Sequence, residues 1–438
     1  MCENLNMKCA GISVLFFLLL NSITGYSVNL PEVLTNTIYT DQIKTVQMYR
    51  EGMSLTNPVI SLNSEEKFQF TFDDLSNELR NYYYTIYHCD RNWKLSRIPQ
   101  EEYLSNFLDF PLTDYAYSQN TKVKYINYLL TLPNEDVSIM YSGNYALVIF
   151  DKDNPDEPLI TWRFYVVEQR INIDARIKRA TFEKDGIQSQ EVDLKIYHDN
   201  FQVNNPMTDL KVVVTQNNRI DNLITNLSPN FTGEGVYEYD FNSQIYFPGD
   251  NEYRYFEFRG NNFPGEGVTD IGYYPPLYHV TLNPATPRIL KDYTFVREIN
   301  GLYRIEMYNS DYPETQADYM MVHFTLELDQ VLSGGGVYVF GALSNWECNK
   351  LNEMHYDLDK KQYELTMLLK QGYYNYCYAW KDFGDNKIKI YSLEGSHYQT
   401  ENDYYIYVYY GMRTDRYDRL IGYKKFNSMK DRSYSVHE

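Results

Sequence analysis

Short runs of β-branched and aromatic residues, each ended by Asn, Asp, Gly or Pro, recur along the whole chain. Such runs are typical of β-strands, and their even spacing between turn signals favours sandwiches over a parallel sheet. Tyr, which favours strands, occupies 46 of the 438 positions. Helical periodicity is scarce and is best near residues 101–107, after Pro99. We therefore predict an all-β fold of consecutive Ig-like β-sandwich domains.

Turn-rich segments and a weak Gly-x-Tyr repeat divide the chain. The repeat precedes a strand at Gly143, Gly235, Gly301 and Gly372, which supports several units of one kind. We predict a signal peptide over 1–27, an N-terminal sandwich over 28–170, a second over 171–310 and a C-terminal one over 311–438.

The N-terminus predicts export. Lys8 precedes the short apolar stretch 9–20, and residues 25–27 (GYS) offer a small-x-small cleavage pattern. We expect cleavage near Ser27, no lipid anchor and no membrane insertion afterwards. The segment from residue 7 would also start well as a signal, so translation starts at Met1 or at Met7.

Charge and cysteine usage restrict the partners. The net charge of -19 repels phosphate backbones and anionic membrane surfaces, which disfavours binding to nucleic acid or lipid. The expected mature chain keeps Cys89, Cys348 and Cys377. Cys348 and Cys377 lie in one predicted domain and could pair, but three cysteines are not a disulfide framework, and we favour free buried thiols.

Candidate catalytic and metal-binding motifs fail on geometry or spacing. His88 and Cys89 neighbour each other in a predicted strand, so they point to opposite faces and cannot share a proton. The loop from Asp151 begins like a calcium loop but breaks that pattern at its fifth position. Asp73 and Asp74 follow a strand, and we expect them in a turn. The sequence therefore predicts no enzyme: no catalytic residue, no cofactor and no metal site.

One segment of the last predicted domain is more specific. Residues 337–346 (VYVFGALSNW), followed by residues 361–363 and 372–376, resemble the early-set sandwiches that bind glycogen or starch. Those modules stack an exposed Trp on sugar rings, and Trp346 and Trp380 could do so. The same fold also uses such aromatics as packing, and we favour that interpretation.

The strand predicted over residues 404–410 carries aromatic or branched side chains on both faces. We expect one face to cover the core of its domain and the other to pack on a neighbour or partner. The residues that follow include Arg416, Tyr417, Asp418 and Tyr423. We predict that this cluster is mainly structural and pins the last hairpin through charge-assisted hydrogen bonds.

Three stretches of the chain carry a family resemblance. They are residues 43–93, with IKTVQMYREG at their start and YTIYHCDRNW at their end, residues 158–168 (PLITWRFYVVE) and residues 415–427 (DRYDRLIGYKKFN). Together they resemble, in family order, the Plug family of the type IX secretion system. The resemblance covers essentially the whole expected mature chain, and the second predicted domain contributes least to it.

The resemblance implies a function. Plug proteins are multi-domain β proteins of the periplasm that sit against the inner face of the outer membrane and occlude the mouth of a large translocon β-barrel. Their family has no known catalytic residue to carry over. The first alternative is a periplasmic or surface glycan-binding protein that uses the C-terminal sandwich, and a second is a β-rich hydrolase whose site assembles from dispersed residues.

Overall fold

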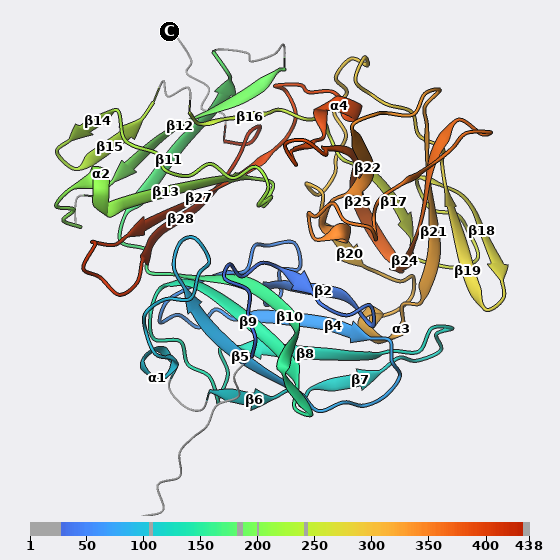
Figure 1. The fold of residues 1–438 in the computed structure, drawn as a ribbon, viewed down its shortest axis with the longest axis horizontal. Helices are drawn as coiled ribbons and strands as arrows, with labels where there is room; N and C mark the ends of the chain where they lie inside the picture. The colour runs from blue at the N-terminus through green and yellow to red at the C-terminus, as the bar shows by residue number, and fades with distance from the viewer. Residues whose placement is uncertain (1–27, 105–107, 182–186, 199–200, 241–243, 432–438) are drawn as a thin grey trace, which may run out of the picture.

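The computed structural model describes residues 28–104, 108–181, 187–198, 201–240 and 244–431. The predicted signal peptide, residues 1–27, lies outside these residues. The described chain is almost entirely β-structure, in sheets that are mainly antiparallel, which confirms the all-β sandwich prediction (Figure 1). In the described part, no helix has the length and apolar character needed to cross a membrane.

The first sandwich is formed by the N-terminal strands, drawn in blue to green in Figure 1. Its larger sheet has the order β1-β10-β9-β5-β6, with β3 parallel to β10, and its smaller sheet the order β2-β4-β8-β7. Alternating Phe, Tyr, Ile and Leu side chains of both sheets meet in one core. The elements are β1 (Thr37–Ile38), β2 (Ile43–Arg50), β3 (Val59–Ser61), β4 (Phe68–Asp74), β5 (Tyr82–Cys89), α1 (Gln100–Tyr103), β6 (Asp109–Pro111), β7 (Tyr115–Tyr117), β8 (Ile126–Leu132), β9 (Gly143–Asp151) and β10 (Asn154–Val167).

The second sandwich is discontinuous in sequence. One sheet has the order β11-β12-β15-β14, with β16 on β12, and the other has the order β13-β27-β28. Figure 1 shows β27 and β28, in red, beside the green β13. The elements are β11 (Asn172–Arg179), β12 (Ser189–Tyr197), α2 (Pro206–Asp209), β13 (Leu210–Gln216), β14 (Phe231–Gly233), β15 (Val236–Tyr239), β16 (Tyr246–Pro248), β27 (Asp403–Tyr410) and β28 (Arg419–Asn427).

The third sandwich lies between β16 and β27 in sequence. Strand β25 pairs with β17, β20, β22 and β26, and this layer packs against a sheet of order β18-β19-β21-β24-β23 around one core. The elements are β17 (Arg254–Phe258), β18 (Val268–Tyr274), β19 (Leu277–Leu282), β20 (Tyr303–Ile305), α3 (Pro313–Gln316), β21 (Tyr319–Glu327), β22 (Gly335–Phe340), η1 (Ala342–Ser344), β23 (His355–Asp357), β24 (Gln362–Lys370), β25 (Gly372–Asp382), β26 (Ile388–Lys389) and α4 (Tyr391–Glu394).

This topology corrects the predicted boundaries at 171–310 and 311–438. The third sandwich begins near Arg254, well before residue 310, and the chain then returns to complete the second sandwich with β27 and β28. The physical reason is that the backbone N–H and C=O groups along β13 need a partner strand, and β27 supplies it in a seven-residue antiparallel register. Turn-rich segments mark where strands end, but they carry no information about which distant strand pairs with which. The resemblance of the last sandwich to early-set modules stays a prediction, and glycan binding by it stays the alternative hypothesis.

Candidate functional site at the junction of the three sandwiches

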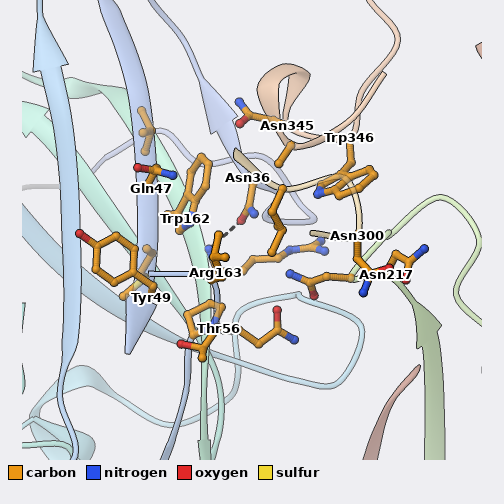
Figure 2. A pocket seen from close by; sticks show the side chains of 18 of the residues that line it. Asn36, Gln47, Tyr49, Thr56, Trp162, Arg163, Asn217, Asn300, Asn345 and Trp346 are labelled. Carbon is orange, nitrogen blue, oxygen red and sulfur yellow. Dashed lines mark hydrogen bonds between the residues drawn. The ribbon is translucent and has the colours of Figure 1, made fainter. Parts of the chain in front are cut away.

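A cavity of about 120 Å³ lies where the three sandwiches meet (Figure 2). The first sandwich contributes side chains from β2, β10 and the loop that precedes β3. The second contributes Tyr405 of β27 and the turn that follows β13, and the third contributes the turns before β20 and after β22. Because no single sandwich encloses this space, the cavity exists only in the assembled molecule.

Asparagine residues with left-handed backbone form much of the wall. Asn217, Asn218, Asn300 and Asn345 have φ values of 51, 60, 53 and 52 degrees. Among residues other than glycine, asparagine adopts this conformation most readily, so each marks a tight turn that carries its amide to the junction. Sequence reasoning missed these residues. In the sequence, these asparagines lie between predicted strands, and this position indicates turns. It does not indicate that three of these turns meet in space.

Arg163 reaches the same cavity from β10. Trp162 and Phe164, its neighbours, point into the core of the first sandwich, so alternation places Arg163 on the outer face of the sheet. Its backbone N–H donates to Asn36 Oδ1 at 2.8 Å, and its Nε donates to the carbonyl of Leu34 at 2.7 Å. The guanidinium is directed toward the Asn300 side of the cavity in Figure 2.

An aromatic cluster joins the first and second sandwiches. Tyr405, Tyr407 and Tyr409 pack with Val59 and Val167 of the first sandwich. The rings of Tyr165 and Tyr407 stack with centroids 4.6 Å apart, and the Tyr409 hydroxyl donates to Asn144 at 2.8 Å. The other face of β27 lies in the second core. This confirms the prediction that one face covers its own core and the other packs on a neighbour.

The loop between β27 and β28 also reaches the first sandwich. Asp418 accepts hydrogen bonds from Arg91, from the backbone N–H at 3.1 Å and from Nη1 at 3.2 Å. Arg416 Nη2 lies 2.5 Å from Glu102, and Arg419 makes two hydrogen bonds of 2.7 Å to Glu168. The predicted charge-assisted bonds therefore exist, and they pin the hairpin to the first sandwich.

A buried ion pair joins the first and third sandwiches. Lys370 Nζ lies 2.6 Å from Asp73 Oδ2, and the two side chains are 1% and 0% exposed. Tyr319 donates its hydroxyl to the same carboxylate oxygen at 2.6 Å, and Asn127 donates to the other at 2.8 Å. The expectation that Asp73 and Asp74 form a turn is wrong. Both lie within β4 and are fully buried, because Lys370 neutralises Asp73 and the Tyr82 hydroxyl binds Asp74 at 2.7 Å.

The structure does not bring Trp346 and Trp380 together as a sugar platform. Trp346 is 9% exposed and packs edge-on against Phe340 and Tyr253, with centroids 5.6 and 6.0 Å away. Gly301, with φ of 77 degrees, lies so close to Trp346 that a side chain there would clash. Trp380 is half-buried on β25, and Lys389 Nζ lies 5.0 Å from the centre of its ring. Glycan stacking by these residues stays the alternative hypothesis.

The remaining sequence candidates are buried single groups. Cys89, Cys348 and Cys377 are free thiols, so no disulfide joins Cys348 to Cys377. Burial raises the pKa of Cys89 and of Cys348 to about 12, which keeps both thiols protonated at neutral pH. Within the ranges that the structure describes, no group of three or more His, Cys, Asp or Glu side chains could hold a metal ion.

His88 is an acid-sensitive core residue. Burial lowers its pKa to about 4, although the Ser142 carbonyl 3.2 Å from Nε2 opposes this shift. The unfolded chain binds a proton near pH 6.5 and the folded chain only near pH 4, so His88 stabilises the fold above pH 6.5 and loses this contribution as the pH falls to 4. We expect wild type to lose about 3 kcal/mol of unfolding free energy relative to His88→Gln over this window, measured by urea denaturation. His355→Gln, on an exposed strand, is the control. Parallel pH profiles for wild type and His88→Gln would contradict the prediction.

Two comparisons with known proteins found matches. The family model described as type 9 secretion system plug protein 1st domain matches residues 43–168. The chain is also similar to a hypothetical protein from Parabacteroides merdae, whose crystal structure was determined at 2.30 Å resolution. The two are 37% identical, the match covers 90% of this chain and 99% of the other, and the TM-score is 0.87. No curated protein matches. The family match begins at β2 and ends just after β10, so it covers the first sandwich.

Proposed function

We propose, because the chain belongs to the type 9 secretion system plug protein family, that it binds and occludes the periplasmic mouth of the outer-membrane translocon of that system. The observation that supports this role beyond the family is the joining of three sandwiches into one body. The first sandwich contacts the second through a buried aromatic cluster and the third through a buried ion pair.

A stopper for a wide aqueous pore must resist deformation. Packed protein interiors have low compressibility, and the first sandwich packs on both of its neighbours. The second and third sandwiches are joined twice by the chain, before β17 and after α4, which restricts their relative motion. The molecule therefore offers a broad and stiff surface rather than a flexible string of domains.

The surface suits a protein partner better than lipid. The net charge of -19 favours a partner whose rim is basic or neutral. Exposed aromatic side chains offer contact area with few torsions to immobilise; examples are Tyr115, Tyr117, Tyr274 and Tyr312. A stable closure should bury more than about 1,000 Å² in total.

A non-enzymatic role fits the family, and we expect no reaction to be catalysed by the chain. The glycan-binding alternative has less support from geometry because Trp346 is 9% exposed and covered by other aromatic rings. Retention of the protein on polysaccharide resin, lost on Trp346→Ala, would favour that alternative.

Deleting the gene is expected to make cells more sensitive to large antibiotics that the outer membrane normally excludes. An unoccluded translocon that passes folded proteins would also pass these molecules. The measurement is the minimal inhibitory concentration for the deletion strain, for the same strain complemented with the wild-type gene, and for a strain that also lacks the translocon.

The double deletion is the matched control, because it should restore exclusion if the leak runs through the translocon. Unchanged sensitivity of the single deletion, in cells that still produce an unloaded translocon, would refute occlusion. Failure of a very large barrel protein to co-purify from detergent-solubilised outer membrane would refute the binding step separately.

A further inference from the structure

Arg163 is a buried cation without an acidic partner. Arg163 is 7% exposed, and charged side chains that are buried to this extent are normally paired with an opposite charge. Within the described parts of the chain, no carboxylate forms an ion pair with Arg163, and Nη1 and Nη2 donate no hydrogen bond. Burial lowers the pKa of Arg163 to about 10, and the groups that oppose this shift are Tyr165, Cys89 and Tyr409 rather than carboxylates.

Three other arginines that are buried or largely buried provide an internal comparison. Arg219 pairs with Asp221 at 2.7 Å and with Asp250 at 2.9 Å. Arg254 and Arg288 both pair with Glu394, at 2.9 and 2.6 Å. Arg219 is buried, and the side chains of Arg254 and Arg288 are 16% and 17% exposed. Carboxylates neutralise all three, and Arg163 differs from them at the cavity.

One face of the Arg163 guanidinium is already occupied. Its Cζ lies 4.3 Å from the centre of the Trp93 ring, and Nε is bound by the Leu34 carbonyl. These contacts hold the guanidinium in place, and its Nη end faces the cavity (Figure 2). A planar guanidinium fixed in this way presents two parallel N–H donors, which match the two oxygens of a carboxylate.

The cavity wall adds polar groups that lack partners. Within the described residues, the Nδ2 of Asn36 and the Nδ2 of Asn345 donate no hydrogen bond. Both are therefore able to donate to a ligand in the cavity. Asn300 Oδ1 also accepts no hydrogen bond from any described group, but it has almost no accessible surface, so a small molecule in the cavity would not reach it. Asn300 Nδ2 is already used, because it donates to Asp403 at 2.8 Å, and Lys425 neutralises that carboxylate at 2.7 Å.

We propose that this junction cavity binds a small organic carboxylate, with Arg163 holding the carboxylate. A volume of about 120 Å³ holds several water molecules, which is enough for a two-carbon or three-carbon acid. The walls also carry Met48, Leu302 and the Trp346 ring, which favour a carbon-bearing acid over inorganic phosphate. Such a ligand would touch all three sandwiches and would stabilise their assembled arrangement.

The test uses the purified mature protein with sodium glycolate, which carries a carboxylate and a hydroxyl, as the probe. Sodium acetate, sodium phosphate and sodium chloride at matched ionic strength are the comparison salts. We expect glycolate at saturation to raise the melting temperature of wild type by about 2 °C or more, and acetate, which carries the same carboxylate, to raise it as well. Calorimetric titration should show at least about tenfold weaker glycolate binding by Arg163→Gln, because charged hydrogen bonds are lost. The exposed Arg176→Gln should bind as wild type does.

Asn345→Asp provides a second variant if Arg163→Gln fails to fold. It places a negative charge on the turn after β22, which lines the same cavity, without altering β10, and Asp tolerates the left-handed backbone at this position. We expect it to abolish glycolate binding. The proposal is overturned if glycolate stabilises wild type no more than chloride does, if phosphate binds more tightly than glycolate, or if Asn345→Asp binds glycolate as wild type does. None of these measurements involves the translocon, so they succeed or fail independently of the proposed occlusion.

Discussion

Replacing Lys370 with alanine is expected to lower the free energy of unfolding by about 3–5 kcal/mol. The reason is that Asp73, fully buried in β4, would lose the ammonium 2.6 Å from its Oδ2 and remain as an uncompensated charge. Lys370 also donates to the Glu314 carbonyl at 2.6 Å and lies 4.2 Å from the centre of the Tyr125 ring, so the substitution removes contacts on both sides of the junction. Urea denaturation followed by fluorescence measures the loss.

Two variants control this result. Lys360→Ala removes an ammonium that pairs with Asp357 and Glu364 at the surface, where its side chain is 58% exposed, and should change the unfolding midpoint little. The double variant Asp73→Asn with Lys370→Met leaves neither charge behind and should recover much of the loss, because hydrophobic replacement of a buried pair is often neutral. A Lys370→Ala midpoint equal to that of Lys360→Ala would show that the ion pair does not hold the first and third sandwiches together.

Glu394→Gln is expected to destabilise the protein by a similar amount, about 3–5 kcal/mol. Glu394 lies at the end of α4, fully buried, and accepts hydrogen bonds from Arg254, from Arg288 and from the backbone N–H of Tyr378. Glutamine keeps the size of the side chain but removes the charge, and it therefore leaves two largely buried guanidinium groups without a counter-ion. The unfolding midpoint in urea at pH 7 measures this loss.

The same substitution has a defined pH dependence. Burial raises the pKa of Glu394, but Arg254 and Arg288 outweigh it and hold the pKa at about 2, below the ordinary 4.5. A lowered folded-state pKa gives stability that is present above pH 4.5 and is lost as the pH falls toward 2. The wild type should therefore lose about 3 kcal/mol across this window, and the difference from Glu394→Gln should shrink with it.

The exposed Glu327→Gln in the same sandwich is the matched control and should follow the wild type at every pH. If the difference between wild type and Glu394→Gln stays constant from pH 6 to pH 3, the charge of Glu394 is not the source of its stabilising effect.

The sequence by itself determined the fold class and the faces of individual strands. In residues 404–410 the alternation of large apolar side chains already indicated two buried faces, and the structure places one in the second core and the other against the first sandwich. This works because the side-chain period of a strand is two residues and is a local property of the backbone. The family resemblance was likewise readable from short motifs, and the match over residues 43–168 agrees with it.

Only the tertiary structure decided which strands and which charges meet. β27 pairs with β13 rather than with the strands of the preceding sandwich, since many strands of similar pattern compete and only packing of the whole molecule selects among them. Asp73 was expected in a turn because nothing nearby in sequence shows that Lys370 neutralises it. Arg163 lies in the motif of residues 158–168 that carries the family resemblance. Its lack of a carboxylate partner depends on which side chains the other segments of the chain place around it. Burial and charge pairing are properties of the assembled surroundings, and a local pattern of residues does not contain them.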